Sequence, residues 1–207
     1  MNLFGLRAMS FGAILVVCAL ESQGQSGITS VTPDETAIYA AILDSPDLRE
    51  SMSRPLIADK TSTFACDTSI CNGMSIGGCN GLRGMNETLA ARMAIVRRDL
   101  PKVDDSTVAA FERENQKCAS IGHNISSHSD YHLFDDSDIS KTWKYSTIVY
   151  FSRVGFDGGH TRALVNVGLM SADRVELSRG FYVLLENHGG TWAFAGTSAV
   201  WALNQPN

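Results

Sequence analysis

The chain has 207 residues, which is the length of one ordinary domain once its first segment is set aside. Hydrophobic residues make up 44% and charged residues 19%, a composition that argues against a disordered chain and against a polytopic membrane protein. The net charge is −5 and no Lys/Arg cluster is interleaved with aromatic residues, so we expect neither nucleic-acid binding nor attachment to anionic membranes.

The first 24 residues resemble a signal peptide. Arg7 supplies the positive n-region, and residues 11–20 form an apolar run that is too short to span a bilayer. Cleavage near Gly24 would leave residues 25–207 as a single domain of a secreted or periplasmic protein. A lipoprotein acylated at Cys18 is the alternative, although Val17 stands where a small residue is normally required.

Two helices are predicted in the first half of the chain. Thr32 begins the first as N-cap, followed by proline and by Glu35 at the third position of a capping box, and Pro46 lies just beyond its end. Residues 54–63 are a candidate early strand. A second helix, capped by Asn86 or Thr88, has apolar residues at helical spacing from position 89 to position 100 and stops at Pro101.

Four cysteines remain after removal of the predicted signal peptide, and an even number in an exported chain favours disulfides. They are Cys66, Cys71, Cys79 and Cys118. Three lie in a glycine-rich stretch that has little to bury, where covalent closure reduces the chain entropy. We favour pairing Cys66 with Cys71 and Cys79 with Cys118, but the other pairings and a four-thiolate zinc site stay open.

A third helix is predicted to begin at Asp104 or Asp105, with Val108, Phe111 and Cys118 on one side. Residues 123–134 alternate loosely as a polar strand or loop. The acidic run at 135–138 is expected to cap a short helical turn, so the helical and cysteine-rich part covers about residues 32–145.

The last third, about residues 146–203, has four β-rich runs separated by turn sequences. They cover residues 148–156, 162–170, 180–186 and 191–203, with the turns Asp157-Gly-Gly and Asn187-His-Gly-Gly between them. Alternation places Phe181, Val183 and Leu185 on one face of the sheet. The sequence therefore predicts an α+β fold in which N-terminal helices pack on a four-stranded antiparallel C-terminal meander.

The strings SRVGF at 152–156, ALVNVG at 163–168, GFYVLLE at 180–186 and GTW at 190–192 resemble a group of exported bacterial proteins of unassigned function. The resemblance covers roughly the last third of the chain. It implies an exported α+β protein and brings no catalytic residues with it. A sheet bent over helices is also similar to the cystatin-like or nuclear-transport-factor-like cone, as an analogy of fold alone.

Three histidines are candidate metal ligands. His123, His128 and His132 lie close together in the sequence, and Asp130 would add a carboxylate. The serine-rich segment around His128 is a poor helix former, which favours solvated loop histidines instead. Ser152, Asp157, His160 and His188 could in principle form a hydrolytic set, but turn chemistry explains the segments that contain Asp157 and His188, and no nucleophile motif is present.

The residues therefore predict a non-enzymatic module, without a cofactor, that binds a protein, a cell-wall component or a small ligand through the sheet and its turns. Two alternatives are a metal-dependent hydrolase built on the three histidines and a structural component of the cell envelope.

Overall fold

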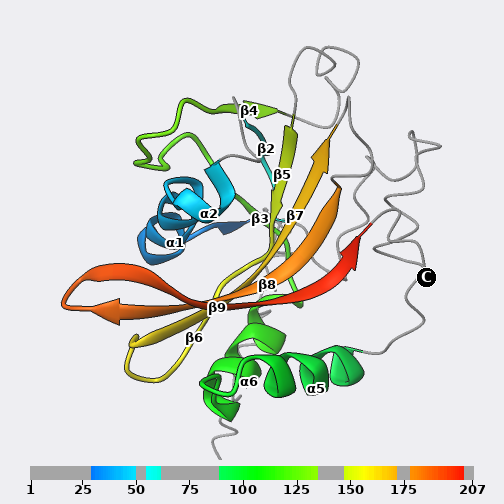
Figure 1. The fold of residues 1–207 in the computed structure, drawn as a ribbon. Coiled ribbons are helices and arrows are strands. Elements are labelled where there is room, and N and C mark those ends of the chain that lie inside the picture. Colours follow the sequence, from blue (N-terminus) through cyan, green and yellow to red (C-terminus); the bar gives the residue numbers. More distant parts are fainter. Residues whose placement is uncertain (1–28, 50–54, 62–88, 135–146, 172–177, 203–207) are drawn as a thin grey trace, which may run out of the picture.

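The computed structural model describes residues 29–49, 55–61, 89–134, 147–171 and 178–202, which form helices on both faces of a β-sheet (Figure 1). The predicted signal peptide, Cys18, Cys66, Cys71, Cys79 and the predicted turn after Phe134 lie outside the described residues. In the part of the chain that is described, no helix has the length and apolar character needed to cross a membrane.

The main sheet has seven strands in the order β4-β2-β5-β7-β8-β9, with β6 also paired to β7. The strands are β2 (Leu56–Ala58), β4 (His132–Phe134), β5 (Thr147–Phe151), β6 (Gly155–Phe156), β7 (Arg162–Ser171), β8 (Arg179–His188) and β9 (Thr191–Ala202). Strands β5, β7, β8 and β9 pair antiparallel, whereas β2 runs parallel to both β4 and β5. A small parallel pair, β1 (Thr29–Ser30) and β3 (Ala119–Ser120), stands apart.

The α+β prediction is therefore confirmed, but the sheet is mixed and larger than the four antiparallel strands that were expected. Two parallel strands extend it beyond β5. β2 lies within the candidate early strand at residues 54–63, and β4 lies at the end of the polar strand or loop expected at residues 123–134. Each is only three residues long, so no local pattern indicates which strand it pairs with.

Helix α1 begins where its capping residues predict. In α1 (Pro33–Leu43), the Thr32 side chain accepts a hydrogen bond from the Glu35 backbone N–H at 3.2 Å, and Glu35 Oε2 accepts one from the Thr32 N–H at 2.8 Å. A short helix, α2 (Pro46–Arg49), follows, and α5 (Leu89–Asp99) ends before Pro101. The caps predicted for α5 at Asn86 and Thr88 lie outside the described residues.

Helix α6 (Asp105–Glu114) has Asp104 as its N-cap, as predicted, but it ends too early to include Cys118. That cysteine lies half-buried just before β3, so its predicted place on the helix is wrong. Asn115 ends α6 because its side chain turns back to the Phe111 carbonyl at 2.9 Å. The disulfide pairing of Cys118 stays a prediction.

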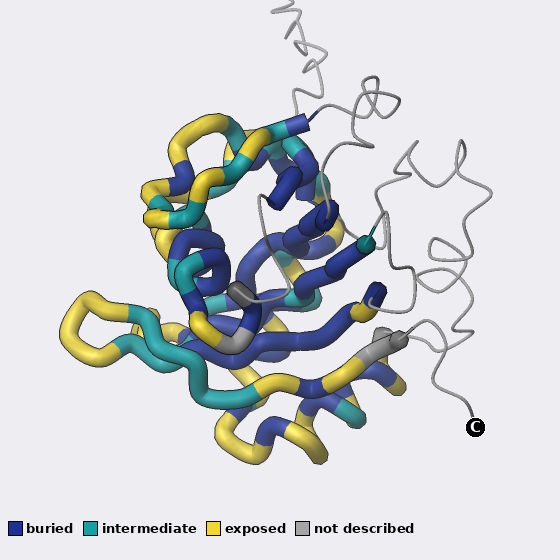
Figure 2. The backbone as a smooth tube through the Cα atoms, turned by 45° about the horizontal axis from the view of Figure 1, so that its top comes forward, coloured by how far each residue is buried: buried dark blue, intermediate teal, exposed yellow. Residues whose placement is uncertain are grey.

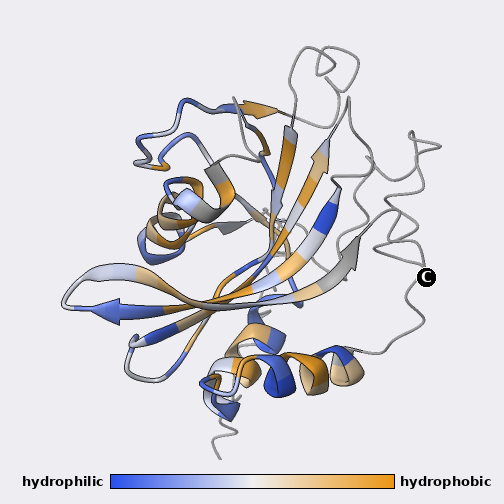
Figure 3. Cartoon of the chain, in the orientation of Figure 1, coloured by the Kyte–Doolittle hydropathy of each residue, from blue (hydrophilic) through white to orange (hydrophobic). Residues whose placement is uncertain are grey.

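Both faces of the sheet are covered, one by α1 and α2 and the other by α5 and α6 (Figure 1). Phe181, Val183 and Leu185 belong to the core on the α1 side, as their alternation predicts. Tyr182 and Leu184 pack on the opposite side with residues of α5 and α6. The middle of β8 is apolar (Figure 3), and its apolar side chains pack on both sides of the sheet. Helices therefore cover two faces of the sheet, where the sequence led us to expect cover on one.

The β8–β9 hairpin extends past α1, and its tip is exposed (Figures 1 and 2). Gly189 and Gly190 have φ angles of 66° and 95°, and the Gly190 N–H donates to Asn187 Oδ1 at 2.7 Å. These left-handed conformations explain why the turn sequence ends in two glycines, and the predicted turn is confirmed.

The Asp104 carboxylate links the start of α6 to the sheet. Its Oδ1 accepts from the Thr107 N–H at 2.8 Å and its Oδ2 accepts from Arg162 Nη1 at 3.0 Å. The Thr107 hydrogen bond is the largest cause that lowers the pKa of Asp104 from 3.8 to about 2.

We expect Asp104→Ala to lower the free energy of unfolding by about 1 kcal/mol at pH 7, because the N-cap is lost. Asp104→Asn retains an N-cap acceptor and is expected to cost less.

Since the folded pKa of Asp104 is depressed, the charged carboxylate stabilises the fold above pH 4, and this contribution falls as the pH approaches about 2. Urea unfolding measured between pH 4 and about 2 tests this expectation. As the pH falls, the free energy of unfolding should decrease less in Asp104→Asn than in the wild type. An identical decrease in both would contradict the stabilising role of the Asp104 carboxylate. Asp105→Ala, at a 91% exposed side chain next to the cap, is the control.

Candidate functional site

The chain leaves the sheet between β5 and β6, at Ser152, Arg153 and Val154. A single strand was predicted over residues 148–156, and that prediction is wrong because these three residues interrupt it. Part of their backbone bonds to side chains instead of a neighbouring strand. The Ser152 carbonyl accepts from Tyr39 Oη at 2.9 Å, and the Val154 N–H donates to Glu35 Oε1 at 3.2 Å.

Asn115 holds the middle residue of this segment. Its Oδ1 accepts from the Arg153 N–H at 2.9 Å and its Nδ2 donates to the Arg153 carbonyl at 3.0 Å. Tyr39 stacks on Phe151 with ring centroids 4.6 Å apart, and burial followed by the nearby Glu35 charge raises the pKa of its phenol well above 10. Tyr39 therefore donates its hydrogen bond as a neutral phenol.

The Arg153 side chain forms a buried ion pair with Glu35. Its Nε lies 2.6 Å from Glu35 Oε1 and its Nη2 lies 3.1 Å from Glu35 Oε2, with side-chain exposures of 10% and 2%. Burial disfavours the charged guanidinium, but the hydrogen bonds and charge of Glu35 outweigh it and raise the pKa of Arg153. The pair joins α1 to the segment between β5 and β6.

Glu114, the last residue of α6, completes this group. Its Oε2 lies 3.4 Å from Arg153 Nη2, and its Oε1 accepts from Arg113 Nε at 3.1 Å. The Glu114 side chain is 33% exposed, so this carboxylate connects the buried pair with solvent.

These residues form one wall of a cleft of about 480 Å³ between the start of α1, helix α6 and the β6–β7 turn. The volume falls in the range of about 300–1,000 Å³ that is typical of small-molecule sites. Seven ionisable side chains line it: Asp34, Glu35, Arg113, Glu114, Arg153, Asp157 and His160. Four carboxylates and two guanidinium groups leave two net negative charges when His160 is neutral.

The β6–β7 turn presents His160 to this cleft. His160 has a φ of 51°, which a residue with a side chain rarely adopts. Its ring stacks on Phe156 at 4.8 Å with an interplanar angle of 4°, and its Nδ1 lies 3.2 Å from Asp34 Oδ2. Such unusual backbone conformations are concentrated at functional sites.

Asp157 stabilises the same turn from within. Its Oδ1 accepts from the N–H groups of Thr161 at 2.6 Å and of Arg162 at 3.1 Å. Burial opposes ionisation, but hydrogen bonds from Thr161 and Arg162 outweigh it and lower the pKa of the Asp157 carboxyl. Asp157 therefore has a turn-forming role, as the sequence indicates.

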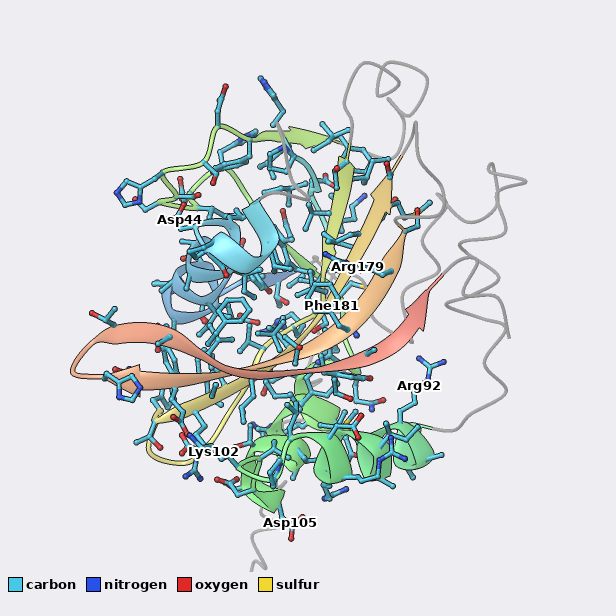
Figure 4. The ribbon with its side chains drawn as sticks, in the orientation of Figure 1. Asp44, Arg92, Lys102, Asp105, Arg179 and Phe181 are labelled. Atoms are coloured by element: carbon cyan, nitrogen blue, oxygen red, sulfur yellow. The ribbon has the colours of Figure 1, made fainter. Side chains whose placement is uncertain are left out.

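The predicted histidine cluster has a different environment. The His128 Nδ1 lies 3.0 Å from Asp44 Oδ2, and the Asp44 carboxylate also accepts from Ser127 Oγ at 2.8 Å and from the Ser129 N–H at 3.2 Å. Figure 4 shows Asp44 at the end of α1, beside the loop that carries His128. Asp44 therefore organises this loop.

The other predicted ligands do not complete a metal site. His123 and Asp130 are exposed, and His132 begins β4, where its N–H donates to the Pro55 carbonyl at 3.1 Å. No group of three or more His, Cys, Asp or Glu side chains within the described residues is arranged to hold a metal ion. The geometry of these residues gives the metal hypothesis no support.

The hydrolytic set is not brought together around Ser152. This serine is 3% exposed, and its Oγ donates to the Arg153 carbonyl at 2.8 Å and accepts from the Asn166 N–H at 2.8 Å. His160 pairs with Asp34, and His188 ends β8 at an exposed position. Ser152 therefore acts as a backbone partner and not as a nucleophile.

Sequence reasoning missed Arg153, Glu114 and Asn115, and it assigned Glu35 to the helix cap alone. One signal was present, because Arg153 stands in an otherwise apolar, strand-like run. A charged residue in such a run needs a partner when it is buried. Its partner lies 118 positions away in the sequence, where no local pattern points to it.

The chain matches no protein-family model, no curated protein and no solved structure. The resemblance to exported bacterial proteins and the analogy with cystatin-like or nuclear-transport-factor-like folds therefore stay predictions from the sequence.

Proposed function

We propose that this protein is an exported, non-enzymatic binding module whose cleft between α1, α6 and the β6–β7 turn takes a small organic cation. The net negative charge of that cleft carries the proposal. The predicted signal peptide supports export, and the partner class follows from the charges that face the cleft.

The charges in the cleft differ in their freedom to bind a ligand. Glu35 accepts four hydrogen bonds, from Thr32, Val154 and Arg153, so its carboxylate is already fully engaged. Asp34 is 61% exposed and pairs with His160 alone among the described residues, whereas Glu114 is 33% exposed and has Arg113 at one carboxylate oxygen and Arg153, at 3.4 Å, at the other. These two carboxylates are the groups that an ammonium ligand would contact.

The rest of the cleft favours a preformed site. The Arg153–Glu35 pair and the hydrogen bonds of Asn115 hold one wall, and the Phe156–His160 stack holds another. A preformed wall reduces the ordering cost of binding, which supports recognition of a small ligand.

The test is a calorimetric titration of the folded protein with spermidine and ethanolamine, with glutarate as an anion of comparable size. We expect the amines to bind and glutarate not to bind. Glu114→Gln and Asp34→Asn should each weaken amine binding about tenfold, because each removes a charge-assisted hydrogen bond worth about 1.5 kcal/mol.

Glu112→Gln is the matched control, since Glu112 lies on α6 two positions before Glu114 but does not line the cleft. It should leave the amine affinity unchanged. Binding of glutarate in place of the amines, or an unchanged affinity in Glu114→Gln and Asp34→Asn, would refute the proposed ligand class.

A further inference from the structure

A second recess, of about 440 Å³, lies on the other side of the first turn of α1. It is bounded by the outer face of α1, the loop after β3 and the tip of the β8–β9 hairpin, which passes beside α1 in Figure 1. We call it the Trp192 groove, after the largest side chain that lines it. The residues that matter below are Trp192, Ala37, Ala41, Asn124, Ser126 and Thr191.

The Trp192 groove contains no charged side chain, although it adjoins the charged cleft. The two recesses are neighbours because Pro33 lines one while Thr32 and Asp34 line the other. A charged ligand would be desolvated in the groove without a counter-charge, which costs free energy, whereas a neutral ligand has no charge to desolvate. The contrast between the two recesses therefore favours a neutral ligand in the groove.

Trp192 provides a fixed apolar platform. Its ring is half-buried and packs against the main core, with the Phe156 ring 5.7 Å away at an angle of 51°. Phe156 is itself held by the His160 ring. The same recess is lined by small side chains of α1, Ala37 and Ala41, which take up little of its volume.

Polar groups with unused hydrogen-bonding capacity surround this platform. Asn124, Ser126 and Thr191 make no side-chain hydrogen bond to any other described residue, and neither does the indole N–H of Trp192. Together they offer an amide, two hydroxyl groups and an indole donor in one recess. A small number of polar groups beside an apolar surface is typical of a small-molecule binding site.

We infer that the Trp192 groove binds a short neutral saccharide. One face of a pyranose ring carries mainly C–H groups, which suit the indole surface, and its hydroxyl groups both donate and accept hydrogen bonds around the ring edge. The lack of charge excludes acidic sugars as the preferred ligand. The inference goes beyond the proposed amine site, because it depends on a different set of residues.

The experiment uses the folded protein labelled with ¹⁵N and follows the indole N–H signals by NMR. Cellotriose, chitotriose and maltotriose are the neutral probes, and Trp192→Phe assigns the Trp192 signal. We expect at least one probe to shift that signal at millimolar concentration. In the variants, binding is followed through the backbone N–H signals of Gly190 and Thr191, which also line the groove. Trp192→Ala should weaken binding at least tenfold, and Asn124→Ala should weaken it severalfold. Asn124 is exposed, so its variant tests the groove even if Trp192→Ala perturbs the hairpin.

Two further variants separate the possible outcomes. Thr197→Ala, at an exposed position of β9 outside the groove, should bind as the wild type does. Asp34→Asn should keep saccharide binding while it weakens amine binding about tenfold, so the two sites can fail separately. The inference is overturned if none of the three saccharides moves the Trp192 signal, or if binding persists unchanged in both Trp192→Ala and Asn124→Ala.

Discussion

Glu35→Gln is expected to lower the free energy of unfolding by about 3–5 kcal/mol, the usual cost of breaking a buried ion pair by removing one partner. Arg153 would keep its charge at a side chain that is 10% exposed, and Glu114 at 3.4 Å is too weak a partner to replace Glu35. The substitution also alters the carboxylate that bonds the Thr32 and Val154 N–H groups. Chemical denaturation at pH 7 measures the change.

A double-mutant cycle distinguishes the ion pair from simple loss of packing. Arg153→Met leaves the Glu35 carboxylate buried, and Glu35→Gln/Arg153→Met removes both charges, so the double variant should lose less than the sum of the single losses. Asp34→Asn, which breaks the exposed Asp34–His160 contact one residue away, should cost less than about 1 kcal/mol. Additive losses in the cycle would show that the two side chains do not depend on each other.

Gly155→Ala is the second substitution with a large expected effect. A Cβ at this position would overlap the backbone N and Cα of Phe111 and lie 2.6 Å from its Cβ, because β6 passes directly against α6. Backbone atoms of a helix cannot move aside as a flexible side chain can, so we expect a loss of about 3 kcal/mol, at the upper end of the usual cost of overpacking. Thermal and chemical unfolding measure it.

The same substitution should also weaken ligand binding in the charged cleft. Displacement of α6 moves Glu114 and Asn115 away from Arg153, so amine affinity is expected to fall together with stability. Gly158→Ala is the control for stability alone, since a Cβ there meets no atom within 4 Å but Gly158 itself lines the cleft. If Gly155→Ala were as stable as Gly158→Ala, the close approach of β6 and α6 would be wrong.

The starts of α1 and α6 could be predicted because their signals are local. Thr32 and Glu35 are three positions apart and form a capping box within one turn, and Asp104 bonds the N–H of Thr107 over the same separation. The glycine turn at positions 189–190 is equally local, because positive φ angles select glycine residue by residue.

The interruption after β5 could not be predicted in the same way. Residues 148–156 have the apolar character of one strand. Tyr39 and Asn115, however, donate hydrogen bonds to the Ser152 and Arg153 carbonyls, so these two groups need no partner on a neighbouring strand. The strand therefore ends where tertiary partners for the backbone appear, and not where the residue pattern changes.

The candidate sites depend even more on distant contacts. The ion pair of the charged cleft joins residues 118 positions apart, and the Trp192 groove combines α1, the loop after β3 and the β8–β9 hairpin. The histidines that are close in sequence do not share a site, because His128 contacts Asp44 at the end of α1 instead of the other histidines. Sequence proximity was therefore a poor guide to which side chains meet.

Hydrogen bonds and dihedral preferences within a few residues are properties of the local chain, so the sequence by itself determined the helix caps, the hairpin turns and the two faces of β8. Only the tertiary structure decided the parallel pairing of β2 and β4, the buried Arg153–Glu35 pair and the two recesses beside α1. The physical reason is that a buried charge or an unpaired backbone group is satisfied by whichever partner the folded chain brings near, and that partner can come from anywhere in the sequence.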